Sequence, residues 1–118
     1  MIYHITTQTE WHTAQQSGHY RAPSLESEGF IHCSTAEQVL KVANAFYSGR
    51  HDLVLLAIDE TQLADKVRWE PPAGAPAEGI PADLLFPHIY SALPLNAVQR
   101  VLPFQPGADG RFSSLPEA

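Results

Sequence analysis

The chain has 118 residues, of which 44% are hydrophobic, and its formal net charge is −6. This length predicts one domain with a real core, and the absence of a basic stretch argues against binding to duplex nucleic acid. No apolar run reaches the roughly 20 residues of a membrane span, and residues 1–12 lack the pattern of a secretory signal. The single cysteine excludes an internal disulfide. We therefore expect a cytoplasmic protein without a membrane partner.

The first quarter of the chain predicts a strand followed by a short helix. Residues 2–6 alternate apolar and polar side chains, as a half-buried strand does. Thr7 and Glu10 then have the spacing of a capping box, in which each side chain pairs with a free backbone group at the start of a helix. Gly18 supplies a C-terminal stop. The expected helix covers about residues 9–17.

A second strand and helix are expected next. Residues 29–33 form an apolar run rich in residues that favour strands. Ser34 and Glu37 repeat the capping-box spacing. From Val39 to Tyr47, apolar residues recur at the i, i+3, i+4 and i+7 positions of an amphipathic helix, which Gly49 would end.

Strands dominate the second half. Residues 53–58, LVLLAI, predict a central strand buried on both faces, and residues 59–64 predict a turn with a short helical piece. Pro94 could open one helical turn. Shorter patterns predict a Pro-rich loop at residues 71–81 and further strands at residues 67–70, 86–90 and 98–104.

This order favours an α+β fold and not a doubly wound parallel sheet. We expect a single domain over residues 1–105, with a mixed, largely antiparallel sheet and two main helices. Residues 106–118, with Gly, Pro and Ser and few large apolar side chains, predict a C-terminal tail or a loosely packed extension.

Three histidines, His4, His32 and His88, lie inside apolar strand-like runs. A buried imidazole without a partner costs about 1–3 kcal/mol, so each needs a bonding arrangement. One interpretation is a non-enzymatic binding or scaffold module in which the three histidines order the sheet. A second is a shared functional cleft. A third is a tri-His zinc site, but no HxH, HxxH or HExxH spacing supports it, and no metal ligands are assigned.

Other polar and aromatic residues are candidates for the same cleft. Glu70 ends the VRWE strand before two prolines, where it could act as a base or bind ribose hydroxyls; an ordinary solvated glutamate is the alternative, and Glu28 has the same two interpretations. Cys33 follows His32 on a strand and should face the other way, which predicts a buried, inert thiol. Tyr20 and Tyr90 could stack on a planar ligand or pack in the core.

Several of these segments together carry a family resemblance. IYHIT, the EW pair after it, EGFIHCS before a helix, RWE and FPHIY closely resemble the bacterial domain-of-unknown-function family numbered 952, from Met1 to about Phe104. That family looks distantly similar to the ADP-ribosyltransferase fold, which includes the RNA 2′-phosphotransferases. IYHIT resembles the YHGT segment, in which the histidine holds the NAD ribose, and GFIHCS resembles the VHLS segment of the phosphotransferases.

The resemblance implies an ADP-ribosyltransferase-like fold and a small nucleotide ligand, with NAD as substrate and ADP-ribosyl transfer as the reaction. The chain departs from the transferases at Ile5, where they have Gly, and no glutamate opens the late strand. The implied catalytic residues are His4, His32, Glu70 and His88. The implied ligand-binding residues are His4, Thr6, Tyr20, Arg21, Ser34 and Tyr90.

Overall fold

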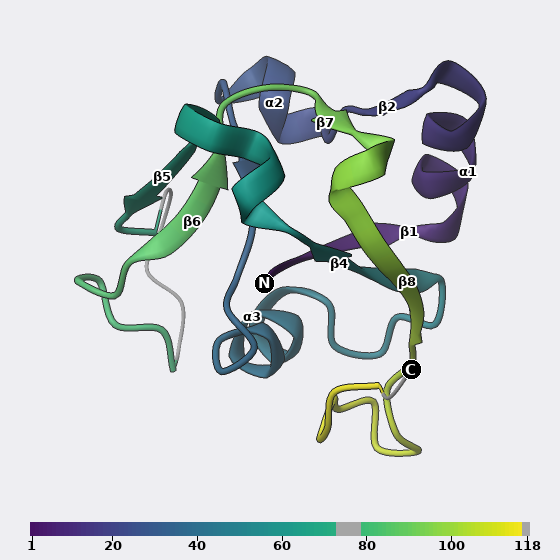
Figure 1. The fold of residues 1–118 in the computed structure, drawn as a ribbon. Coiled ribbons are helices and arrows are strands. Elements are labelled where there is room, and N and C mark those ends of the chain that lie inside the picture. Colours follow the sequence, from purple (N-terminus) through teal and green to yellow (C-terminus); the bar gives the residue numbers. More distant parts are fainter. Residues whose placement is uncertain (73–78, 117–118) are drawn as a thin grey trace.

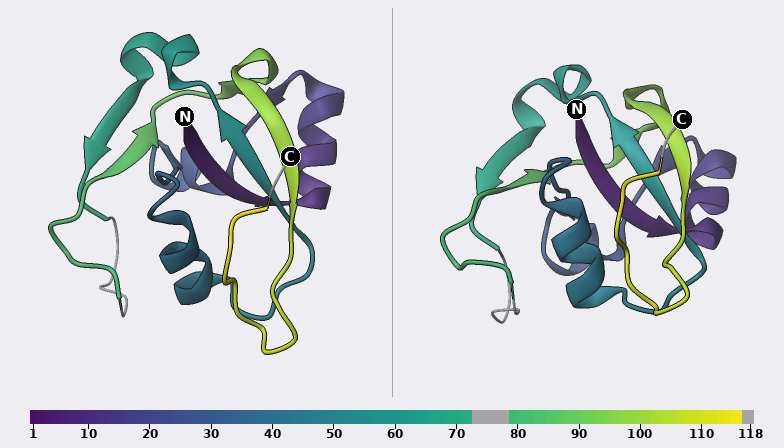
Figure 2. Two further views of the ribbon diagram at one scale, coloured as in Figure 1. Left: turned by 60° about the horizontal axis from the view of Figure 1, so that its bottom comes forward. Right: turned by 90° about the horizontal axis from the view of Figure 1, so that it is seen from below.

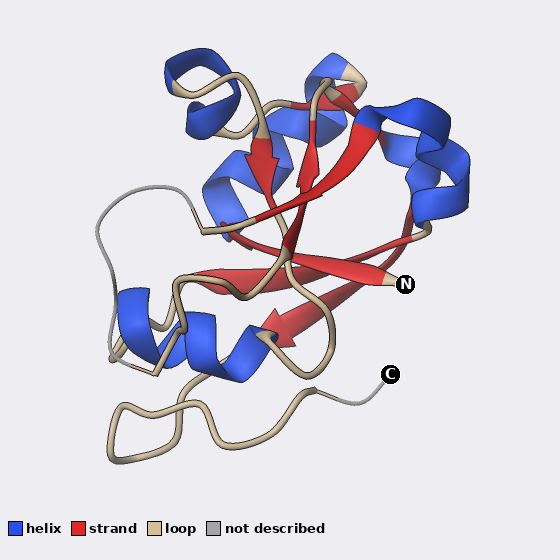
Figure 3. Ribbon diagram, turned by 90° about the vertical axis from the view of Figure 1, so that its left-hand side faces the viewer, coloured by secondary structure: helices blue, strands red, loops and turns tan. Residues whose placement is uncertain are grey.

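The computed structural model describes residues 1–72 and 79–116. Its strands form two three-stranded sheets and one two-stranded pair, and every strand pairing among the described residues is antiparallel. Helices pack around these sheets (Figure 3). The predicted α+β class is therefore confirmed, and the expected mixed sheet is antiparallel throughout the described part.

The first sheet has the order β1-β4-β8. It consists of β1 (Ile2–Thr7), β4 (Leu53–Ile58) and β8 (Val98–Phe104), with β4 in the middle (Figure 1). All six β4 residues are buried. Alternate side chains of β4 serve two cores: Val54, Leu56 and Ile58 pack in one cluster, and Leu53 and Leu55 in the other. The prediction of a central strand buried on both faces is confirmed.

The second sheet has the order β3-β6-β5. It consists of β3 (Ile31–His32), β6 (Phe86–Ile89) and β5 (Val67–Glu70). The register pairs His32 with His88 and His88 with Arg68. Strand β3 is shorter than the predicted run at residues 29–33. The separate pair joins β2 (His19–Tyr20) to β7 (Leu93–Pro94).

Helix α1 (Gln8–Ser17) begins and ends at the predicted signals. The Thr7 hydroxyl accepts a hydrogen bond from the Glu10 N–H at 3.0 Å. Gly18 adopts the left-handed conformation, with φ of 91°, and its N–H donates to the Ala14 carbonyl at 2.9 Å. That φ favours glycine because a side chain would be strained there.

Helix α3 (Val39–Phe46) begins later than predicted, so the capping role expected for Ser34 is wrong. Ser34 instead forms a β-bridge with Tyr3, with two backbone hydrogen bonds of 2.8 Å. The Thr35 N–H is bonded by the Gln38 side chain at 2.9 Å, and Gln38 is the N-cap residue. A contact distant in sequence therefore overrides the local capping signal.

Short helices complete the described chain. Helix α2 (Pro23–Ser27) was not predicted, since five residues are too few to reveal a helical period; Pro23 opens it. The 3-10 helices are η1 (Glu60–Lys66), capped by Asp59, and η2 (Leu95–Ala97), which follows Pro94 as expected. In the predicted loop at residues 71–81, positions 73–78 lie outside the described residues. No described helix is long and apolar enough to cross a membrane.

The C-terminal segment runs beside α3 and β8 (Figure 2). Phe112 is buried and stacks on Phe104, with ring centroids 4.6 Å apart. Asn44 of α3 bonds both backbone groups of Phe112, at 2.8 and 2.9 Å. The extension is thus attached to the core through Phe112; residues 117–118 lie outside the described part.

Candidate functional site

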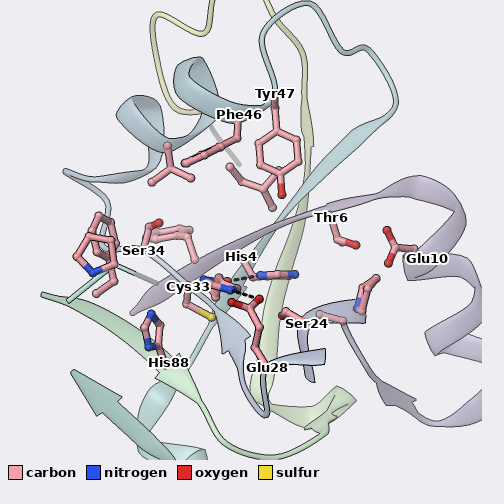
Figure 4. A pocket seen from close by; sticks show the side chains of 18 of the residues that line it. His4, Thr6, Glu10, Ser24, Glu28, Cys33, Ser34, Phe46, Tyr47 and His88 are labelled. Carbon is pink, nitrogen blue, oxygen red and sulfur yellow. Dashed lines mark hydrogen bonds and ion pairs between the residues drawn. The ribbon is translucent and has the colours of Figure 1, made fainter. Parts of the chain in front are cut away.

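A cleft of about 580 Å³ lies between α3, β1 and the second sheet. Figure 4 shows Phe46 and Tyr47 on the side of α3, with His4, Glu28 and His88 across from them. One wall is therefore aromatic and the opposite wall carries imidazole and carboxylate groups.

Six of the nine predicted site residues line this cleft, and all three strand histidines are among them. Three do not line it: Arg21 is exposed to solvent, and Glu70 and Tyr90 reach the cleft only through His88, since Glu70 bonds both His88 and Tyr90. The six that do are His4, Thr6, Tyr20, His32, Ser34 and His88.

His4 joins the two sheets. Its side chain projects from β1, and its Nδ1 bonds the backbone carbonyl of His32 in β3. Its Nε2 lies 2.7 Å from the Tyr20 hydroxyl, which lies 2.9 Å from the Thr6 hydroxyl. His4, Tyr20 and Thr6 are all buried. Both ring nitrogens of His4 are thus occupied by the protein itself.

The proton positions in this chain follow from the chemistry of the partners. A carbonyl only accepts, so His4 Nδ1 carries a hydrogen. Burial lowers the pKa of His4 from 6.5 to about 4, so at neutral pH the ring is neutral and its Nε2 is an acceptor. The single hydroxyl proton of Tyr20 is then donated to His4, and the Thr6 hydroxyl donates to Tyr20. Burial also raises the pKa of Tyr20, which keeps the phenol protonated.

One face of the second sheet is polar and aromatic. Side chains directly opposite on paired strands share a face, and side chains two positions apart along a strand do as well. The isoleucines at positions 31 and 89 face the apolar core. The register therefore places seven other side chains on the opposite face, which we call the polar face: Phe30, His32, Arg68, Glu70, Phe86, His88 and Tyr90.

Within the polar face, Glu70 holds both His88 and Tyr90. Its Oε1 lies 2.8 Å from His88 Nδ1 and accepts a 2.6 Å hydrogen bond from the Tyr90 hydroxyl. Phe30 stacks on His88, with centroids 4.2 Å apart and planes 19° apart. Arg68 lies over the Tyr90 ring at 4.8 Å. The His88 ring is therefore fixed by a carboxylate at one nitrogen and by an aromatic face.

Glu70 and His88 carry different charges at neutral pH. The hydrogen bonds from Tyr90 and His88 hold the pKa of Glu70 below its usual range. Burial lowers the pKa of His88, and the bond to Glu70 opposes that effect only in part. At neutral pH Glu70 is an anion and His88 is neutral, with its proton on Nδ1 facing the carboxylate. No described residue bonds His88 Nε2, and His88 lines the cleft.

A second Glu–His pair lies beside the first. His32 Nε2 lies 2.8 Å from Glu28 Oε2, and the two side chains are 42% and 40% exposed. The His32 ring meets the His88 ring edge-on, with centroids 5.4 Å apart. This pair is open to solvent, whereas His88 is 2% exposed.

Cys33 does not take part in this chemistry. It is buried and packs in the apolar core with Ile31, and burial raises the pKa of its thiol. The expected buried thiol is confirmed, although Cys33 lines the cleft together with His32.

Three parts of the site were missed in the sequence: the aromatic wall of Phe46 and Tyr47, which was interpreted only as part of a helical stripe, and Phe30 and Arg50. Phe30 lies two residues before His32, and strand periodicity could have placed both on one face. Arg50 lines the cleft, bonds Asp52 at 2.7 and 3.1 Å, and lies 5.9 Å from the Tyr47 ring centre. It follows a turn and carries no signal that relates it to the histidines. Across residues 1–72 and 79–116, no group of three or more His, Cys, Asp or Glu side chains could hold a metal ion.

Comparisons with known proteins agree with this fold. A family model described as "Protein of unknown function (DUF952)" matches residues 5–101. The crystal structure of protein CC0527 from Caulobacter crescentus is similar, with a TM-score of 0.81 at 31% identity, over 95% of this chain and 92% of that chain. The solution NMR structure of CC0527 matches with a TM-score of 0.76 at 31% identity, over 95% and 90% of the chains. No curated protein matches the chain.

Proposed function

The chain belongs to the DUF952 family of proteins of unknown function, and we propose from its cleft that it binds a nucleotide ligand of the NAD class. The carrying observation is that His4, His32 and His88 converge on one cleft with an aromatic wall. Its volume of about 580 Å³ falls within the range of about 300–1,000 Å³ found for small-molecule sites.

The two walls suit different parts of such a ligand. Phe46 is 60% exposed at the cleft and offers a face on which a planar base can stack. Ser34, His32 and His88 offer polar groups to ribose hydroxyls. Arg50 is the one Arg or Lys side chain among the described lining residues, so the phosphates are assigned to it. His4 acts by fixing Tyr20 and Thr6, because its own nitrogens are occupied.

Isothermal titration with NAD and with ADP-ribose tests the proposal, with amide chemical shifts as a second readout. We expect binding that saturates below millimolar ligand. Phe46→Ala should weaken binding about tenfold if a base stacks there, since one stacking contact contributes about 1–3 kcal/mol. Trp69→Ala is the matched control, because Trp69 is also an exposed aromatic, at 49%, and does not line the cleft. No heat and no shift change at millimolar ligand would contradict the proposal.

A non-enzymatic scaffold is the second candidate, and the bonding of His4 favours it. A histidine with both nitrogens bonded to buried groups orders the junction between two sheets whether or not a ligand binds. This candidate requires His4→Gln and His88→Gln to destabilise the fold by similar amounts. Chemical denaturation of both variants distinguishes it from a ligand site, in which His88→Gln has the smaller effect on stability.

A further inference from the structure

We propose that His88 is a general base, positioned by Glu70 and Tyr90, that takes a proton from a hydroxyl group in the cleft. The inference rests on the proposed function, because the hydroxyl belongs to water or to an acceptor that attacks the bound ligand. It adds a reaction step and the residues that carry it out.

The first support is the convergence of the group on one sheet face. Glu70 comes from β5, His88 comes from β6, and Tyr90 directly follows β6, yet one Glu70 carboxylate oxygen contacts His88 at 2.8 Å and Tyr90 at 2.6 Å. Glu70 therefore cannot rotate without losing two hydrogen bonds. Because the Tyr90 proton and the His88 Nδ1 proton both meet this oxygen, the carboxylate stays ionised and keeps His88 in one tautomer.

The second support is that Nε2 of His88 is free to accept a hydrogen bond from a group in the cleft. With Nδ1 bonded to Glu70 and the ring held against Phe30 at 4.2 Å, Nε2 keeps its lone pair and has no partner among the described residues. His88 lines the cleft, so this lone pair is the acceptor that it offers there. A carboxylate–imidazole pair with a free nitrogen is the arrangement by which many enzymes remove a proton from a hydroxyl.

The groups around His88 set its proton affinity from three sides. Glu70 faces it from β5, His32 faces it from β3, and Glu28 faces it from the end of α2. Burial and the neighbouring His32 lower the pKa of His88, whereas the two carboxylates raise it. Arg68 lies opposite His88 in the register of β5 on β6. The neutral form therefore prevails near pH 7, which is the form that a base requires.

On NAD, the reaction transfers the ADP-ribosyl group from nicotinamide to the acceptor hydroxyl. The acceptor oxygen forms a bond to C1′ of the nicotinamide ribose while the bond from C1′ to the ring nitrogen breaks. The electron pair of that bond returns to the positively charged ring, and nicotinamide leaves as a neutral molecule. The acceptor proton moves to His88 Nε2 and then to solvent. No oxidant, reductant or metal is needed.

The test measures nicotinamide release from NAD against pH, and NAD affinity by titration, in the full chain. His88→Gln should lower release by a factor on the order of 10²–10⁴, the usual range for a general base. Glu70→Gln should lower it by a smaller factor, with the NAD affinity changed less than threefold. Glu26→Gln is the matched control, because Glu26 is an exposed carboxylate on α2 outside the cleft.

The pH profile of nicotinamide release distinguishes a role of Glu70 and Tyr90 in tuning His88 from a purely structural role. Glu70→Gln removes the anion that stabilises protonated His88, so the acid limb of the profile should move to lower pH. Tyr90→Phe leaves Glu70 a stronger acceptor for His88, so the limb should move to higher pH. Cooperative unfolding of Glu70→Gln and Tyr90→Phe would show that both variants are folded. If the two residues had only a structural role, the acid limb would not move in opposite directions in these variants.

Three results would overturn the inference. NAD binding without nicotinamide release in the wild-type protein would leave the proposed function intact and contradict the base. Absence of NAD binding would remove both. Nitrogen-15 spectra of the free protein give a ligand-independent check: a proton on Nε2 of His88 at pH 7, in place of Nδ1, would contradict the base whatever ligand binds.

Discussion

His4 in the first sheet and His88 in the second are both buried, and both come from apolar strand sequences, but their ring nitrogens have different surroundings. His4 bonds a carbonyl and a phenol, both inside the protein. His88 bonds one carboxylate, and its other nitrogen has no partner among the described residues. His4 therefore connects the two sheets through both of its nitrogens, and we call it the structural joint. His88 instead leaves one nitrogen free to accept a hydrogen bond at the cleft.

The difference has a physical origin in the partners. Carbonyl and hydroxyl groups do not stabilise a buried positive charge as a carboxylate does, so burial determines the state of His4. Glu70 supplies a carboxylate to His88 and partly opposes burial. A histidine that is to gain and lose protons needs such a partner, whereas a joint does not.

The largest expected effect comes from removing the joint. His4→Ala leaves a cavity between the sheets and takes away the partners of the His32 carbonyl and the Tyr20 hydroxyl. We expect the free energy of unfolding to fall by about 3–4 kcal/mol, from the cavity and the unpaired groups together. Urea denaturation measures this loss of stability. The control is His12→Ala, which removes an exposed histidine of α1. A loss under about 1 kcal/mol would mean that His4 is not a joint.

These two roles show which parts of the molecule were predictable from sequence. The apolar run of β4 and the capping of α1 by Thr7 are set by near neighbours, and both were predicted. The bond between His4 and Tyr20 depends on how α1 and the turn after it return the chain to β1. Sequence spacing contains no information on that distance, so the partner of His4 could not be named.

The strands of the second sheet were predicted, but their pairing was not, for a related reason. Glu70 was selected as a candidate, but its contact with His88 depends on the register of β5 on β6, across a long loop. Ser34 was given a capping role because its local pattern favours one, and its bridge to Tyr3 is a pairing across the chain. Local patterns predict elements, and cross-strand register decides which side chains meet.

The next largest effect is the response of the joint to acid. In the unfolded chain His4 binds a proton below pH 6.5, but in the folded protein only below about pH 4. The unfolded state therefore holds more protons in that interval, and stability falls as the pH falls. At about 1.36 kcal/mol per unit, the contribution of His4 approaches about 3 kcal/mol at pH 4.

Unfolding free energies at pH 7 and pH 4 measure this response. His4→Gln removes the titrating group, so its loss of stability over the interval should be smaller than that of the wild type by about 3 kcal/mol. His12→Gln removes an exposed histidine and should respond as the wild type does. Equal acid sensitivity in wild type and His4→Gln would show that His4 is protonated in the fold, contrary to the neutral joint.

A smaller effect is expected from the packing that fixes His88. Phe30→Leu keeps an apolar side chain but removes the ring that stacks on His88 at 4.2 Å. Aromatic pairs contribute about 0.5–1.5 kcal/mol beyond burial, so we expect a loss of about 1–2 kcal/mol in urea denaturation. Phe46→Leu, at a ring that is 60% exposed, should change stability by less than about 0.5 kcal/mol. Equal effects of the two substitutions would mean that Phe30 does not hold His88.

The smallest expected effect concerns the solvent-exposed Glu28–His32 pair. It tests whether this pair contributes to stability as His4 does or as little as an ordinary surface ion pair. Its side chains are 42% and 40% exposed, and ion pairs at such positions contribute about 0–1 kcal/mol because water screens them and ordering opposes them. Glu28→Gln should therefore lower stability by about 0.5 kcal/mol or less, and added salt should abolish the difference. Glu26→Gln is the control, because it removes an exposed carboxylate of α2 that is outside this pair. A salt-independent loss of several kcal/mol would instead place His32 with His4 as a second joint, because only a pair shielded from water would resist screening.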